Sequence, residues 1–251
     1  GDNVVARSDR TPWYDGPSLL ELLEDIEVTA SAPRIGLRFG VQLTLRPQSA
    51  AIDPRYAEYR GYAGLVSAGH VSVGDEVVVL PEGLRTSVTG IDLAGRELTT
   101  AVTGQSVSLR LAHEVDLARG ALISSVDDAP EPTVDIDGTL CWLDERPLRL
   151  GQRVLLKHST RTVQALVRQI TSRLDLDSVS AVGTDSLVLN DIGRVTLRLA
   201  APVLAEDYAT NRSGGAFLLI DPQTAHTRAA GTVRGPTIFG DRFGDAWNWE
   251  I

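Results

Sequence analysis

The chain has 251 residues, of which 43% are hydrophobic and 23% charged, a composition typical of a globular protein with one or two domains. Its formal net charge of −9 argues against a nucleic-acid-binding surface. The one cysteine, Cys141, excludes an intrachain disulfide and a cysteine-based zinc site, and it is consistent with a reducing cytosol.

The ends of the chain and its longest apolar runs bear on targeting. No run of about 18 apolar residues and no secretory signal pattern is present, so we expect neither a membrane span nor export. The chain begins with glycine and contains no methionine. We therefore expect it to be a piece of a longer protein.

The segment 9–26, DRTPWYDGPSLLELLEDI, predicts one isolated helix. Ser18 and Glu21 have the spacing of a capping box, and the apolar side chains that follow lie on one helical face. These apolar residues are Leu19, Leu22, Leu23 and Ile26. A helix of about three turns is marginal alone, so this face needs a partner. The partner is either the β domain that follows or a preceding domain that is missing here.

The next part of the chain reads as short strands separated by glycine-rich turns. The strand patterns cover residues 35–45, 60–81, 84–93, 105–113 and 118–124. Within 60–81, Val73-Gly74-Asp75 predicts a tight turn between two strand-like runs. Several short strands at regular spacing favour a closed barrel over an open sheet.

A polar, acidic and proline-containing segment, 124–133, then predicts a domain boundary. A second set of strand patterns covers residues 134–143, 151–159, 160–170, 192–203, 214–221 and 226–233. No helix of crossover length separates them, which makes a parallel βαβ architecture improbable. We predict an all-β chain of two consecutive β-barrels preceded by one short helix. The expected domain bounds are 1–33, 34–126, 127–235 and 236–251.

The motifs that usually carry chemistry are missing. The sequence has no P-loop, no N-K-x-D motif and no G-x-S-x-G elbow, and its two D-x-x-G matches, at 92–95 and 241–244, read as turns. The four histidines have no metal-ligand spacing. We therefore predict no catalytic, cofactor-binding or metal-binding residue in this chain.

Two segments remain as candidate contact surfaces. Residues 155–165, LLKHSTRTVQA, place Lys157, His158 and Arg161 at a hairpin turn of an otherwise acidic chain. This turn is either solvated or a contact for an acidic partner surface or a nucleotide-bearing domain. The tail 235–251 carries four aromatic residues and lies either in a groove of the second barrel or against a partner.

Several segments resemble a known family. Residues 60–77, RGYAGLVSAGHVSVGDEV, are similar to the barrel signature of domain II of the translation-factor GTPases. The segments WYDGPSLLE (13–21) and LKHSTRTV (156–163) more specifically resemble the large, GTP-binding subunit of bacterial sulfate adenylyltransferase. The resemblance extends to about residue 233. The GTP-binding domain of that family is absent from this sequence, and the tail after Gly235 has no counterpart that we identify.

The resemblance implies a role in sulfate activation in the cytoplasm. The complete protein would pair with a smaller catalytic subunit that makes adenylylsulfate and pyrophosphate from ATP and sulfate, driven by GTP hydrolysis. GTP and magnesium are expected only with the missing GTPase domain. The barrels would act in coupling and in subunit docking, with no nucleic acid or membrane as partner, and the helix at 18–26 would lead out of the GTPase domain.

The resemblance also suggests which residues make contacts. Lys157, His158, Thr160 and Arg161 are the expected interdomain or intersubunit contact. Trp13, Tyr14 and Asp15 are the expected hinge between domains. Two alternatives stay open: a translation-factor-like module that binds RNA or the ribosome, and a stand-alone scaffold without catalysis.

Overall fold

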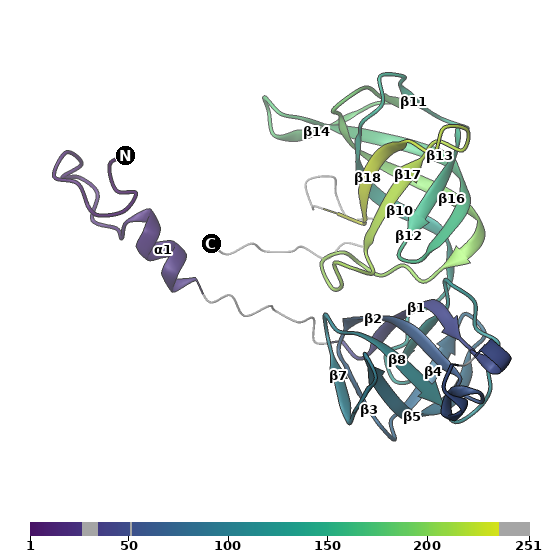
Figure 1. The fold of residues 1–251 in the computed structure, drawn as a ribbon. Helices are drawn as coiled ribbons and strands as arrows, with labels where there is room; N and C mark the ends of the chain where they lie inside the picture. The colour runs from purple at the N-terminus through teal and green to yellow at the C-terminus, as the bar shows by residue number, and fades with distance from the viewer. Residues whose placement is uncertain (27–34, 51, 236–251) are drawn as a thin grey trace. The chain divides into compact units, whose positions relative to one another are not determined.

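The computed structural model describes residues 1–26, 35–50 and 52–235 (Figure 1). The extended segment expected after the helix and the aromatic tail lie outside the described residues. The chain divides into two compact units, Gly1–Ala32 and Pro33–Ile251. Among the described residues, no helix has both the length and the apolar character needed to cross a membrane.

The first unit contains the predicted helix, α1 (Leu19–Asp25). The capping box is confirmed: the Ser18 hydroxyl accepts a hydrogen bond from the Glu21 N–H, and the Glu21 carboxylate accepts one from the Ser18 N–H at 2.6 Å. The helix buries none of its residues, and Leu23 is 58% exposed. Local hydrogen bonds therefore define this helix, and its apolar stripe stays exposed.

The second unit begins with a barrel of six main strands. These are β1 (Arg38–Leu45), β2 (Gly61–Ala68), β4 (Glu76–Leu80), β5 (Leu84–Leu93), β8 (Ser106–Leu111) and β9 (Leu122–Ser125). They pair in the order β4-β9-β1-β2-β8-β5, and β4 also pairs with β5, which closes the ring. Alternate residues point inward along each strand. Phe39, Val66, Ile91 and Leu109 are among those that fill the core.

Two 3₁₀ turns and three short strands add to this barrel. Two 3₁₀ turns, η1 (Gln48–Ala50) and η2 (Pro54–Tyr56), lie between β1 and β2. β6 (Arg96–Leu98) extends the sheet beyond β5, and β3 (His70–Ser72) pairs with β7 (Thr100–Val102). The tight turn predicted at residues 73–75 is present, with Gly74 at a φ of 100°. It joins strands of two different sheets, because β3 pairs with β7 whereas β4 pairs with β5 and β9.

The second barrel has the same strand number and a different order. Its main strands are β10 (Thr133–Trp142), β12 (Arg153–His158), β13 (Arg161–Asp175), β16 (Ile192–Val203), β17 (Ala216–Ile220) and β18 (Thr227–Val233). They follow the order β12-β17-β18-β10-β16-β13, closed by pairing of β12 with β13. Trp142, Leu156, Leu197 and Leu219 lie in its core. The predicted fold class is confirmed: two consecutive β-barrels preceded by one short helix.

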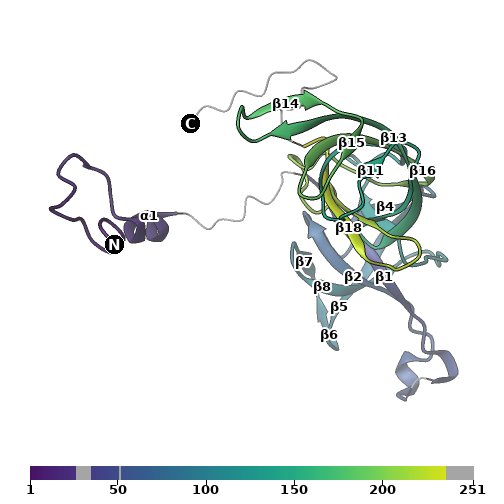
Figure 2. The same cartoon turned by 90° about the horizontal axis from the view of Figure 1, so that it is seen from above.

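Two further strand pairings belong to the second barrel. β11 (Leu148–Arg149) pairs with β15 (Ser186–Leu187). The end of β13 pairs with β14 (Ser180–Gly183), and its last two residues, Leu174 and Asp175, pair with no other described strand. The two strands form an arm that projects from the barrel in both views (Figures 1 and 2). The sequence patterns end this strand at residue 170, so the arm was not predicted.

An ion-pair cluster holds one end of the second barrel together. Arg228 on β18 is buried and pairs with Asp221, and its Nε lies 3.0 Å from an Asp144 carboxylate oxygen. Asp221 is 4% exposed and also accepts backbone N–H groups of the turn that follows β17. The cluster therefore joins the ends of β10, β17 and β18.

Candidate functional site

The hairpin that carries the predicted contact residues lies against the first barrel. β12 and β13 are joined by Ser159 and Thr160. A side-chain carbon placed on Gly40 of β1 would lie 3.5 Å from the Ser159 hydroxyl, and one on Gly120 would lie 3.5 Å from the Arg161 side chain. Gly120 also has a φ of 105°, which favours glycine. The first barrel thus presents two glycines where the hairpin approaches.

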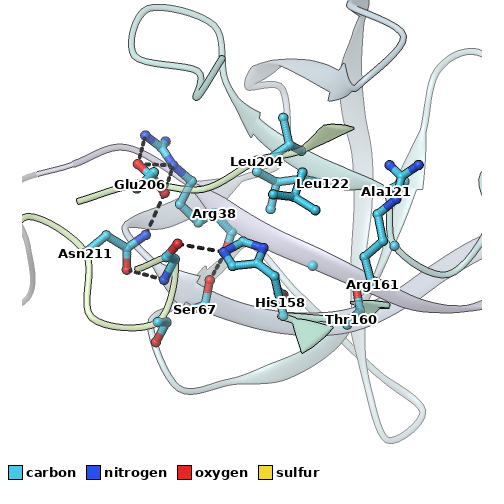
Figure 3. A pocket seen from close by; sticks show the side chains of 16 residues that line it. Arg38, Ser67, Ala121, Leu122, His158, Thr160, Arg161, Leu204, Glu206 and Asn211 are labelled. Carbon is cyan, nitrogen blue, oxygen red and sulfur yellow. Dashed lines mark hydrogen bonds and ion pairs between the residues drawn. The ribbon is translucent and has the colours of Figure 1, made fainter. Parts of the chain in front are cut away.

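A small cavity lies between the hairpin and the first barrel (Figure 3). Its volume is about 60 Å³. Both barrels line it: Arg38, Ser67 and Leu122 from the first barrel, and His158, Thr160, Arg161, Glu206 and Asn211 from the second. A water molecule occupies roughly 30 Å³, and small-molecule sites usually measure about 300 Å³ or more. The cavity therefore has room for about two waters and not for a nucleotide.

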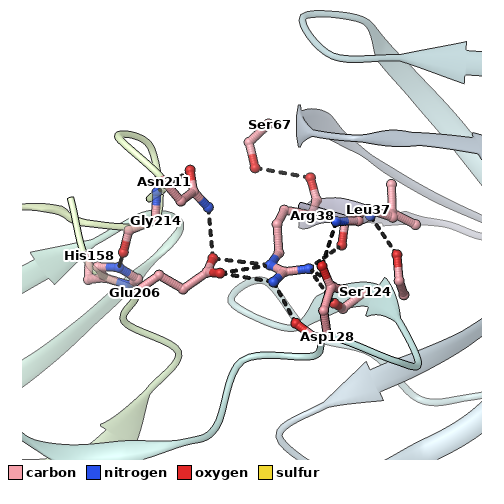
Figure 4. Close-up of polar contacts among 11 residues, drawn as sticks. Leu37, Arg38, Ser67, Ser124, Asp128, His158, Glu206, Asn211 and Gly214 are labelled. Carbon is pink, nitrogen blue, oxygen red and sulfur yellow. Dashed lines mark hydrogen bonds and ion pairs between the residues drawn. The ribbon is translucent and has the colours of Figure 1, made fainter. Parts of the chain in front are cut away.

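Arg38 joins the two barrels (Figure 4). It lies on β1 and is 3% exposed. Its guanidinium donates to the carboxylate of Glu206, a residue that follows β16, at 2.9 and 3.1 Å. On the other side it donates to the Ser124 hydroxyl at 3.1 Å and to the Asp128 carboxylate at 3.2 Å. We call Arg38, Ser124, Asp128, Glu206 and Asn211 the interbarrel network.

The charges of the interbarrel network stabilise one another. Burial alone would lower the pKa of Arg38, but its hydrogen bonds and ion pairs with Glu206 and Asp128 raise it overall. Burial likewise acts to raise the pKa of Asp128, and the Gly36 N–H and Arg38 outweigh it, so that this pKa is lowered. Asn211 donates to Glu206 at 2.7 Å and fixes its carboxylate. Arg38 and Asp128 are therefore both ionised at neutral pH.

His158 supports the loop that carries Glu206. Its imidazole is buried, and Nε2 donates to the Gly214 carbonyl at 2.7 Å. The same carbonyl accepts the Glu206 N–H at 3.0 Å. Burial lowers the pKa of His158, and the Gly214 carbonyl and the charge of Glu206 oppose this shift without cancelling it. His158 is thus a neutral hydrogen-bond donor at neutral pH, which stabilises the loop rather than attracting an anion.

The remaining predicted residues lie elsewhere. Lys157 is half-buried on β12, opposite Thr162 and Leu218 on the neighbouring strands, and it does not line the cavity. In the first unit, Trp13 is 79% exposed and lies edge-on to Tyr14, whose hydroxyl donates to the Pro17 carbonyl at 2.8 Å. Asp15 lies 3.4 Å from Arg7 on the surface. The hinge assigned to residues 13–15 stays a prediction.

Sequence reasoning missed the interbarrel network itself. Arg38 stands between two buried apolar residues, Leu37 and Phe39, in a strand that alternates in the ordinary way. An arginine in that position normally reaches solvent. Arg38 is buried because the second barrel packs over that position.

Comparison with known proteins first defines the class. A solved structure of Sup35 in complex with GMPPNP has a TM-score of 0.71 and 22% identity, covering 93% of this chain and 56% of that one. Residues 135–234 match the family model described as GTP-eEF1A C-terminal domain-like. The fold is thus a translation-factor pair of β-barrels.

Sequence comparison then identifies the relatives. The chain is 42% identical to a bifunctional enzyme CysN/CysC of Mycobacterium tuberculosis, and 38% identical to sulfate adenylyltransferase subunit 1 of Methylorubrum populi. Both alignments cover 93% of this chain, but only 38% and 48% of the relatives. The expected resemblance is confirmed: the chain is homologous to proteins named sulfate adenylyltransferase subunit 1 and bifunctional enzyme CysN/CysC. It spans less than half the length of these relatives.

Proposed function

We propose that this chain is the barrel pair of a GTPase-dependent sulfate adenylyltransferase and acts there in coupling and subunit docking. The observation that carries the proposal is homology over nearly the whole chain together with a buried ionic contact that unites the barrels. A pair of barrels that packs as one unit can transmit a displacement from one end to the other as a rigid body. No described residue is assigned a bond-making role.

The partners follow from the relatives' names and from the resemblance. A protein called subunit 1 implies a second subunit, which we take to be the smaller catalytic one that joins ATP and sulfate. A GTPase domain would bind GTP and magnesium and would contact the barrels. We place the assembly in the cytoplasm, with no nucleic acid or membrane as partner, in keeping with the net charge of −9.

Within this function, the hairpin of Thr160 and Arg161 has a defined task. It lies against Gly40 and Gly120 of the first barrel, and we expect this contact to help hold the angle between the barrels. We expect Arg161→Glu to weaken the contact, because it replaces the aliphatic part of a side chain that lies against Gly120 with a shorter, charged one. Lys157→Glu, on the same hairpin but outside the cavity, is the matched control.

A chimera tests the proposal directly. This chain replaces the matching segment of the Mycobacterium tuberculosis CysN/CysC protein, and adenylylsulfate synthesis is measured with the small subunit, with and without GTP. We expect GTP to stimulate synthesis, and Arg161→Glu to reduce the stimulation while GTP hydrolysis continues. A folded chimera that hydrolyses GTP and binds the small subunit, but whose synthesis GTP never stimulates, would contradict the coupling role.

Docking is tested separately by sedimentation. The 251-residue chain is mixed with the small subunit of a sulfate adenylyltransferase. Formation of a complex supports a docking surface on the barrels. If no complex forms while the chimera does bind the small subunit, the docking role belongs to the rest of the large subunit and not to this chain.

A further inference from the structure

Among the described strands, two extend a barrel sheet beyond its closed ring. β6 extends the first barrel beyond β5, and β14 extends the second beyond β13. Among the described strands, each pairs on one side only. The outer edge of such a strand offers backbone N–H and C=O groups to another chain, and natural proteins usually protect it with charged residues or proline.

The two edges differ in that protection. β6 consists of Arg96, Glu97 and Leu98, so two of its three residues are charged. β14 consists of Ser180, Ala181, Val182 and Gly183, with no charge and no proline, and all four are exposed. The turn of the same arm exposes Leu176 and Val179 to 76% and 66%. Figure 2 shows this arm projecting from the barrel.

We propose that the free edge of β14 pairs antiparallel with β14 of a second copy of this chain. The edge is self-complementary, because a two-fold axis through Val182 places valine opposite valine and alanine opposite glycine. Both faces of the joined strands carry small uncharged side chains near the axis. The two arms would then form one continuous four-stranded ribbon.

Side-chain pairing within the four residues of β14 selects the register. An axis through Val182 places two β-branched side chains directly opposite each other, and such cross-strand pairs stabilise a sheet. An axis through Ala181 would instead pair alanine with alanine and each valine with a serine. A shift of one copy by a single residue is excluded. The N–H and C=O groups that point outward from one strand would then face residues whose own groups point away.

The contact is short, so the dimer should be weak and concentration-dependent. We would follow the full 251-residue chain by sedimentation equilibrium from about 1 μM to about 500 μM, the range over which such a dimer dissociates. We expect a monomer–dimer equilibrium. Val182→Lys should raise the dissociation constant at least about tenfold, because two ammonium groups would meet at the axis.

Two control variants separate this edge from other exposed apolar side chains. Val102→Lys changes a residue of β7 that is 50% exposed, and Leu23→Glu changes the exposed stripe of α1. Neither should alter the dissociation constant. A chain that stays monomeric over the whole range, or a dimer that Leu23→Glu weakens and Val182→Lys does not, would overturn the proposal.

Cross-linking gives a second, independent test. Residues directly opposite each other in an antiparallel pair have Cα atoms about 4.5–5.5 Å apart, which a disulfide can span. Oxidised Val182→Cys should therefore form a covalent dimer, whereas Val102→Cys under the same conditions should not. An equal yield from both variants, as random collision would produce, would count against the β14 pairing.

Discussion

Arg38 and Arg228 form the same kind of buried ion pair in two different parts of the molecule. Each is buried, and each pairs with two carboxylates. The partners of Arg228 all belong to the second barrel, so that cluster holds one fold together. Those of Arg38 belong to the second barrel and to the segment between the barrels, so that network holds two folds against each other. Loss of the first should destabilise one domain, whereas loss of the second should uncouple the unfolding of two domains.

The largest effect is expected for Arg228→Met. It removes the buried cation of Asp221, which is 4% exposed and keeps only the exposed Arg146 nearby, and removing one partner of a buried ion pair typically costs about 3–5 kcal/mol. The free energy of unfolding, measured in urea, should fall by that amount. Arg146 contacts the same carboxylates but is 71% exposed, so Arg146→Met should cost less than about 1 kcal/mol. Equal losses for the two variants would show that burial is not what matters.

The next effect is expected for Arg38→Met. We expect a loss of about 2–3 kcal/mol, since Glu206 stays largely buried while Asp128, which is 40% exposed, can take up water. The unfolding curve should also separate into two transitions as the barrels lose their coupling. Arg198→Met, which breaks the exposed ion pair with Asp135, is the control and should leave a single transition.

A double variant sharpens the same prediction. Arg38→Met with Glu206→Leu removes the buried carboxylate together with its cation. Its loss should be smaller than the sum of the two single losses, because the buried carboxylate of Glu206 is no longer left unpaired and the remaining one, Asp128, is 40% exposed. Additive losses would mean that Arg38 and Glu206 act independently.

The free energy of unfolding should depend on pH through His158, which lies at the interface between the barrels. The pKa of His158 is lowered by burial from its ordinary 6.5, so below that pH the unfolded chain binds more protons than the folded one. The contribution of a neutral His158 to stability is therefore fully present above about pH 6.5 and is lost as the pH falls toward the folded pKa. His158→Gln keeps an N–H for Gly214 and removes this titration. As the pH falls from about 7.5 to about 5.5, the free energy of unfolding of this variant should therefore rise relative to that of the unmodified chain. A difference between the two chains that does not change with pH would contradict the assignment.

The sequence predicted those elements that are determined by residues close to one another in the chain. The capping box of Ser18 and Glu21 depends on a few neighbouring residues, and strand alternation depends on which face is buried. β5 and β16 lie where the patterns place them, at 84–93 and 192–203. Barrel closure followed from strand count and turn spacing.

The features that could not be predicted depend on contacts between residues far apart in the chain. Arg38 and Glu206 are 168 residues apart, and neither sits in a motif. The sequence pointed to Lys157, His158 and Arg161 through their basic cluster, and the resemblance added Thr160, but neither indicated the surface that the hairpin meets. The arm of β13 and β14 was missed because it has no buried face, and alternation only appears where one face is buried.

The smallest effect is expected for Ser18→Ala in α1, and it sharpens the contrast between local and long-range stabilisation. Removing the hydroxyl that accepts the Glu21 N–H should cost about 1 kcal/mol of helix stability. Hydrogen exchange of the Leu22 and Ile26 amides, which bond within this turn and the next, should accelerate accordingly. The unfolding transition of the barrels should not change, because the helix buries no residue and belongs to a separate compact unit. A shift of that transition by the cap variant would show instead that the helix contributes to barrel stability.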